Sequence, residues 1–93
     1  MVECWVVVVN RLGLHARAAS QVVRLASRFH STIKLEREDG SAVADAKSIL
    51  SVLMLAAARG TRLRATAEGV DEREALDSLC KLFAEGFGEE AEK

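Results

Sequence analysis

The chain has 93 residues and contains no proline, and it shows no low-complexity linker and no internal repeat. A chain of this length without a linker is expected to form one domain. Aromatic residues make up only 4% of the sequence, and the formal net charge is −1. A nucleic-acid-binding protein typically carries a basic excess or aromatic side chains for base stacking, so the composition disfavours that class.

Cysteine and long apolar runs are also scarce. Cys4 and Cys80 lie far apart in the sequence and belong to no CxxC motif or Cys/His cluster, so we expect no metal site. We predict two buried free thiols, which are typical of a reducing compartment. The longest nearly apolar run, residues 49–58, is far shorter than the roughly 20 residues of a membrane-spanning helix. The N-terminus lacks the basic segment of a signal peptide, so we expect a cytoplasmic protein.

Apolar periodicity predicts secondary-structure elements in the order β-α-β-β-α-β-α. The valine-rich residues 2–9 predict a strand buried on both faces, and Asp39 with Gly40 predicts a hairpin turn. The predicted fold class is α+β, with a four-stranded antiparallel sheet and three helices packed in a second layer on one face. The expected strands are residues 2–9, 32–37, 41–44 and 61–68, and the expected helices are residues 16–28, 46–58 and 71–85.

The last predicted helix has recognisable signals at both ends. Asp71 and Glu74 have the spacing of a capping box at its start. The chain from Gly86 onward is acidic and is expected to fray. We therefore expect a domain over residues 1–88, followed by an acidic frayed tail over residues 89–93.

The segment with the most chemical information is residues 12–17, with the sequence LGLHAR. It places His15 where an extended run changes to a helix, so that the unpaired N–H groups of Ala16 and Arg17 and the helix dipole favour a bound phosphate. Imidazole, with an unperturbed pKa of about 6.5, keeps a neutral nitrogen available as a nucleophile toward phosphorus. The alternative interpretation is a histidine that only caps the helix.

The second predicted helix is more apolar than a surface helix requires. Residues 49–55 carry apolar side chains in two stripes, whereas a helix on a two-layer fold buries only one. Either this helix lies deeper than the others, or one stripe is an exposed docking patch, a role that suits Met54. Gly60 would end the helix. Ser48, near its start, is either a cap or a phosphorylation site, because a helix N-terminus tolerates an added phosphate.

Two segments together resemble one known family. Residues 12–17 resemble the active-site segment of the histidine-containing phosphocarrier protein HPr, and residues 46–49, with the sequence AKSI, resemble its regulatory serine segment. The resemblance implies an open-faced β-sandwich that works in the phosphoenolpyruvate-dependent phosphotransferase system as a carrier, without a cofactor and without enzymatic turnover. It also implies that enzyme I phosphorylates His15 on Nδ1, that Arg17 helps to neutralise the phosphoryl group, and that an enzyme IIA component receives it.

The resemblance further implies that HPr kinase/phosphorylase, in lineages that have it, modifies Ser48. The protein is expected to be a monomer that binds neither nucleic acid nor the membrane interior. Ala18 replaces the proline usual in the family, which loosens the start of the helix. Some segments look more like the nitrogen-related branch, NPr, and both branches stay open. The residues expected to dock on partners are Arg24, Lys47, Ile49, Leu50, Leu53 and Met54.

Other functions remain as alternatives. The same surface suits a regulatory binding module in which phosphorylation of His15 or Ser48 acts as a switch. A small nucleic-acid-binding α+β domain is disfavoured by the low aromatic content and the net charge. A stand-alone enzyme is disfavoured because the spacing suggests no second acid or base beside His15.

Overall fold

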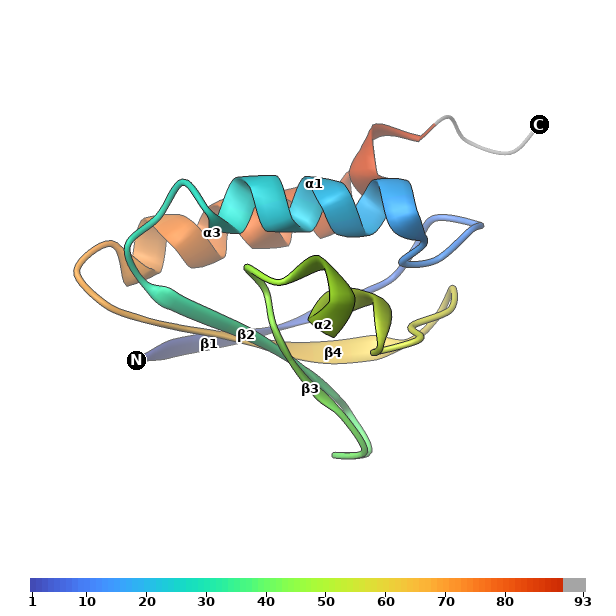
Figure 1. The fold of residues 1–93 in the computed structure, drawn as a ribbon, viewed down its shortest axis with the longest axis horizontal. Coiled ribbons are helices and arrows are strands. Elements are labelled where there is room, and N and C mark those ends of the chain that lie inside the picture. The colour runs from blue at the N-terminus through green and yellow to red at the C-terminus, as the bar shows by residue number, and fades with distance from the viewer. Residues whose placement is uncertain (90–93) are drawn as a thin grey trace.

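One antiparallel sheet organises the chain in the computed structural model, which describes residues 1–89 (Figure 1). The strands lie in the order β1-β4-β2-β3, so that β4, near the end of the chain, pairs with both β1 and β2. In the shared register Ala65 of β4 lies between Cys4 and Leu35. The strands are β1 (Val2–Val7), β2 (Thr32–Arg37), β3 (Val43–Asp45) and β4 (Arg62–Glu68).

The helices form the second layer. Helices α1 and α3 run side by side over one face of the sheet, and α2 packs against α1 and β3 (Figure 1). A short 3₁₀ helix, η1, follows α3. The predicted two-layer α+β fold and its element order are therefore confirmed. The helical segments are α1 (Ala16–Ala26), α2 (Ile49–Leu53), α3 (Glu72–Ala84) and η1 (Gly86–Gly88). None of the helices within residues 1–89 has the length and apolar character that crossing a bilayer requires.

Strand β1 shows that the sheet is covered on one face only. Val6, and Val8 just after the strand, are buried under the helices, whereas the Trp5 side chain on the other face is 48% exposed. The Trp5 ring is covered in part by the Arg62 guanidinium, 4.7 Å from its centroid. The prediction of a strand buried on both faces is wrong, because a run of valines fits a half-exposed strand as well as a buried one.

Helix α2 is much shorter than the predicted helix over residues 46–58. It ends at Leu53, and Ala56 has a left-handed backbone with a φ of 50°. The chain turns there so that Leu55 and Ala57 both enter the core, at 1% and 4% exposure. Gly60 therefore does not end the helix. Apolar residues at helical spacing also fit an irregular segment that is buried by tertiary contacts, which explains the error.

The carboxylate of Asp71 links two loops instead of forming a capping box with Glu74. It accepts hydrogen bonds from the backbone N–H of His30 and from the N–H and hydroxyl of Ser31, and it makes no cap bond within α3. The hydrogen bond from the Ser31 hydroxyl, with those from the backbone, lowers the pKa of Asp71 to about 2. The Asp71 side chain therefore bonds to Ser31, 40 residues away in sequence, and not to the first turn of its own helix.

Cys4 and Cys80 form a disulfide that joins β1 to α3. The prediction of two free thiols is wrong, because the face of β1 that carries Cys4 packs against the helix that carries Cys80. The large separation in sequence gave no hint of this proximity. The cysteines consequently give no argument for a reducing compartment.

The chain after α3 packs against the domain as far as residue 89. The Phe87 side chain is 2% exposed, and its ring meets that of Phe83 edge-on with centroids 4.9 Å apart. Fraying from Gly86 onward is therefore wrong for residues 86–89. The rest of the predicted tail, residues 90–93, lies outside the described residues.

Candidate functional site

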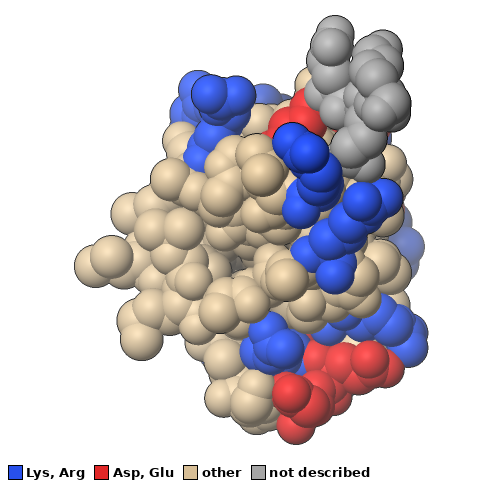
Figure 2. All heavy atoms as spheres, turned by 90° about the vertical axis from the view of Figure 1, so that its right-hand side faces the viewer, with Lys and Arg blue, Asp and Glu red and all other residues tan. Residues whose placement is uncertain are grey.

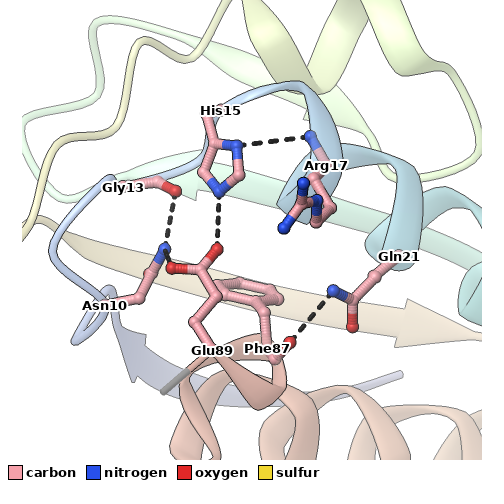
Figure 3. Close-up of polar contacts among 7 residues, drawn as sticks. All are labelled: Asn10, Gly13, His15, Arg17, Gln21, Phe87 and Glu89. Atoms are coloured by element: carbon pink, nitrogen blue, oxygen red, sulfur yellow. Dashed lines mark hydrogen bonds and ion pairs between the residues drawn. The ribbon is translucent and has the colours of Figure 1, made fainter. Parts of the chain in front are cut away.

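His15 occupies the N-cap position of α1. Its backbone is extended, with φ −78° and ψ −178°, and its carbonyl accepts the N–H of Ala19 at 2.8 Å. Its Nδ1 accepts a hydrogen bond from the backbone N–H of Arg17 at 3.4 Å (Figure 3). The ring nitrogen therefore does what a serine or aspartate oxygen does at other helix starts. The predicted change from loop to helix at this residue is confirmed.

The loop before His15 is fixed by a close approach between two backbones. The N–H of Leu14 donates to the carbonyl of Ala57 at 2.9 Å, and the Leu14 side chain enters the core. Gly13 has a φ of 71°, and a Cβ atom added to it would lie 2.7 Å from the Ala57 oxygen. The irregular segment after α2 is thus the support on which the His15 loop rests.

The opposite ring nitrogen of His15 contacts the C-terminal segment. Nε2 lies 2.5 Å from Oε2 of Glu89, and the two side chains are 27% and 18% exposed (Figure 3). Asn10 donates from Nδ2 to Oε1 of Glu89 at 3.1 Å and to the carbonyl of Gly13 at 2.8 Å. The hydrogen bond from His15, followed in size by that from Asn10, lowers the pKa of Glu89. The carboxylate is thus ionised beside the ring at neutral pH.

Arg17 supplies a positive charge at this end of α1. Its side chain is exposed, and its guanidinium contributes to the lowered pKa of Glu89 through charge attraction. Ala16, at the first helical position, has no acceptor for its N–H within the helix. The first N–H groups of the helix make the surroundings of Nδ1 favourable for an anion, and the guanidinium adds positive charge at the same end of α1.

Ala18 occupies the third helical position and is fully buried. Its N–H is one of the first-turn donors without an intrahelical partner, so the residue sits where proline is also compatible with a helix. The helix nonetheless begins directly after His15 with alanine at this position.

Helix α2 presents apolar side chains beside the His15 segment. Exposed fractions are 40% for Ile49, 69% for Leu50 and 78% for Met54, whereas Leu53 is half-buried and packs against the core. Figure 2 shows this end of the molecule, with a broad uncharged area on the side of α2 and Lys and Arg side chains around it. Ser48 caps the helix, because its hydroxyl oxygen accepts the N–H of Ser51 at 3.3 Å.

The two basic residues predicted to aid docking have different surroundings. Arg24 is exposed in the last turn of α1. Lys47 is half-buried, and its Nζ donates to the carbonyl of Phe29 at 2.8 Å. Arg24 is therefore the more available of the two for a charged partner.

Sequence reasoning missed Glu89 and Asn10. Glu89 falls in the segment expected to fray, and nothing local indicates that the chain folds back over His15. Asn10 belongs to a polar loop whose amide has many possible partners. Within residues 1–89, no group of three His, Cys, Asp or Glu side chains is arranged to hold a metal ion.

The close approach at Gly13 gives a test of this architecture. Gly13→Ala should lower the free energy of unfolding by about 2–4 kcal/mol, because it combines left-handed strain with a clash against the Ala57 carbonyl. Gly40→Ala is the matched control, since Gly40 has a φ of 76° but no atom within 4 Å of an added Cβ. The free energy of unfolding of Gly40→Ala, measured in urea, should be only about 1 kcal/mol below that of the parent protein. Equal losses in the two variants would contradict the close approach.

Comparison with known proteins covers nearly the whole chain. The family model described as "PTS HPr component phosphorylation site" matches residues 2–85. The phosphocarrier protein HPr of Cupriavidus necator is 48% identical over 82 residues, which cover 88% of this chain and 90% of that protein. The phosphocarrier protein NPr of Proteus mirabilis is 40% identical over 85 residues, which cover 91% and 93%. Relatives of both branches are thus among the matches.

A solved structure agrees with these sequence matches. The crystal structure of HPr-C-His from Thermoanaerobacter tengcongensis is similar with a TM-score of 0.91 and 38% identity, over 98% of this chain and 100% of that chain. The fold of this chain is therefore the open-faced β-sandwich expected from the resemblance. With its motif, element order and fold in agreement, the chain belongs to the HPr family of phosphocarrier components of the phosphotransferase system.

Proposed function

We propose that His15 accepts a phosphoryl group from enzyme I and passes it to an enzyme IIA component, in the cytoplasm and as a monomer. The observation that carries this proposal is the position of Nδ1 at the N-cap of α1, beside the N–H of Arg17. Family membership supports the phosphocarrier role. The histidine is partly exposed, so that a partner protein can reach it.

The chemistry follows from this position. The Nδ1 lone pair forms a bond to phosphorus while the bond from phosphorus to the donor breaks and its electron pair leaves with the donor. The new phosphoryl oxygens then lie at the N-terminus of α1, where the N–H groups of Ala16 and Arg17 and the Arg17 guanidinium can bind them. This stabilisation must stay modest, because tight binding of the phosphorylated state would slow the next transfer.

The two histidines allow a direct test. His15→Ala should abolish acid-labile labelling by enzyme I and phosphoenolpyruvate, because the nucleophile is lost. His30→Ala is the matched control, since the His30 side chain is exposed in the loop before β2, and it should label like the parent protein. Measurement of radiolabel per protein distinguishes the variants, and full labelling of His15→Ala would refute the proposal.

The exposed apolar side chains of α2 are proposed to dock on the partner proteins. They lie on the helix that leads directly into the segment supporting Gly13 and Leu14, so a protein seated on them reaches His15. Leu50 and Met54 are the most exposed of the set, with Ile49 and the half-buried Leu53 at its edge. Arg24 and Lys47 would add attraction toward an acidic partner face. A brief encounter requires a small interface, below about 1,200 Å².

Charge placed on this patch should weaken transfer. Met54→Asp should raise KM for phosphorylation by enzyme I about tenfold, a loss of about 1.4 kcal/mol, because an apolar contact is replaced by a charge that must be desolvated. The control is Val70→Asp, at an apolar residue that is 89% exposed in the turn before α3. Both values come from initial rates at varied protein concentration, and equal KM values would remove Met54 from the interface.

Ser48 is proposed as a regulatory phosphorylation site for HPr kinase/phosphorylase. Its hydroxyl caps α2 at the edge of the apolar patch, so a phosphoryl group there would meet the helix N-terminus and add negative charge beside the docking residues. This position also favours the second candidate function, a regulatory binding module that changes partners when Ser48 is modified. Acceptance of phosphate by an enzyme IIA protein separates the two functions, since only the carrier requires it.

The capping role of Ser48 makes a clean substitution possible. Aspartate and asparagine are both good N-caps, so Ser48→Asp and Ser48→Asn should keep α2 intact. Only Ser48→Asp adds a charge, and it should slow phosphorylation by enzyme I several-fold, while Ser48→Asn stays near the parent rate. Stopped-flow or quenched-flow rates give the comparison, and identical rates for the two variants would contradict an electrostatic effect at this position.

A further inference from the structure

We propose that Glu89 is a positioning residue that fixes which ring nitrogen of His15 is free to receive a phosphoryl group. The inference rests on the proposed function and extends it to a residue at the far end of the sequence. Nε2 of His15 and the carboxylate of Glu89 are joined by a hydrogen bond (Figure 3).

The two contacts of the His15 ring select one neutral tautomer. An ionised carboxylate only accepts hydrogen bonds, so Nε2 carries the hydrogen that Glu89 receives. The backbone N–H of Arg17 donates to Nδ1, which therefore presents a lone pair. A neutral imidazole has one donor and one acceptor nitrogen, and both contacts fit the same assignment. Nδ1 is then the nucleophile, and Nε2 is blocked.

The backbone after α3 is folded so that Glu89 reaches the ring. Gly86, Phe87 and Gly88 have φ values of 61°, 61° and 73°, three consecutive left-handed residues. The conformation is strained for Phe87, which is not a glycine, and it is retained where surrounding contacts enforce it. Those contacts are the buried edge-on packing against Phe83 and the hydrogen bond from Gln21 Nε2 to the Phe87 carbonyl at 2.9 Å.

Asn10 fixes the carboxylate from the other side. Asn10 is a buried residue, 6% exposed, and its Nδ2 donates both to Oε1 of Glu89 and to the carbonyl of Gly13. One residue thus connects Glu89 to the loop that carries His15. The carboxylate is held by a strained turn, a buried ring and a buried amide, an arrangement that exceeds what an incidental surface ion pair requires.

The same contact assists the chemistry. When Nδ1 attacks phosphorus and the donor leaves with its electron pair, the ring gains a positive charge and keeps the hydrogen on Nε2. The Glu89 carboxylate neutralises this charge, and no proton has to be transferred. In the next transfer the N–P bond breaks, the electron pair returns to Nδ1, and Nε2 again keeps its hydrogen. A fixed carboxylate beside a histidine acts in this way in other nucleophilic sites.

The first test uses the protein alone. Long-range ¹H–¹⁵N NMR of neutral His15 should show the tautomer with hydrogen on Nε2 in the parent protein and in Glu85→Gln, the matched control at an exposed glutamate before η1. Glu89→Ala should give a mixture of tautomers. Glu89→Gln, which keeps an acceptor oxygen, should retain the parent tautomer, and thermal unfolding verifies that each variant is folded. An unchanged tautomer in Glu89→Ala would overturn the proposal.

The second test examines which nitrogen reacts. Phosphoramidate, a small phosphoryl donor, should modify Nδ1 of the parent protein and both ring nitrogens of Glu89→Ala, as read by ³¹P NMR of the intact proteins. With enzyme I as donor, Glu89→Gln should be slowed about tenfold by loss of the compensating charge. The inference would be refuted if Glu89→Ala were modified on Nδ1 alone and Glu89→Gln were phosphorylated by enzyme I at the parent rate. Loss of enzyme I labelling in the parent itself would instead refute the proposed function, because the tautomer measurement needs no partner.

Discussion

The start of α1 is the constraint on which the site depends. The first N–H groups of a helix need acceptors, and His15 meets part of this need with Nδ1, the atom proposed to react. Phosphorylation would remove the lone pair that accepts the Arg17 N–H, but it would place phosphoryl oxygens in the same region. On the proposed function, the first N–H groups of α1 would have acceptors in both states, so the same part of the helix would position the nucleophile and later bind the phosphoryl group.

The sequence alone was sufficient to predict the features that depend on residues close to one another along the chain. Helical and alternating periodicity placed the elements in the right order, because each element buries one face in this fold. The position of His15 before α1 followed from the change of pattern around Gly13. The sequence left two interpretations for Leu50 and Met54, because a second apolar stripe on a helix can be either buried or exposed to solvent.

The failures have a common physical cause, which is contact between residues distant in sequence. Asp71 binds Ser31 instead of its own helix, and Cys4 meets Cys80 across the two layers. The helix predicted over residues 46–58 ends at Leu53, because the chain turns at Ala56 and takes Ala57 into the core. Glu89 lies 74 residues from His15 in sequence, and its acidic surroundings read as a solvated tail. Local sequence patterns contain no information on these contacts. The site depends on two of them, the contact of the Ala57 segment with the His15 loop and the contact of Glu89 with His15.

On the proposed assignment, the charges around His15 are balanced. The helix N-terminus and Arg17 attract an incoming phosphoryl group, and additional positive charge would hold it longer than a carrier can allow. Glu89 contacts Nε2, on the ring edge away from Nδ1, so its charge stabilises the cationic ring more than it repels the phosphoryl oxygens. A carrier has to make the N–P bond and break it with similar ease. A carboxylate that stabilises the charged ring while the bond forms and breaks, without binding the phosphoryl group, meets both requirements.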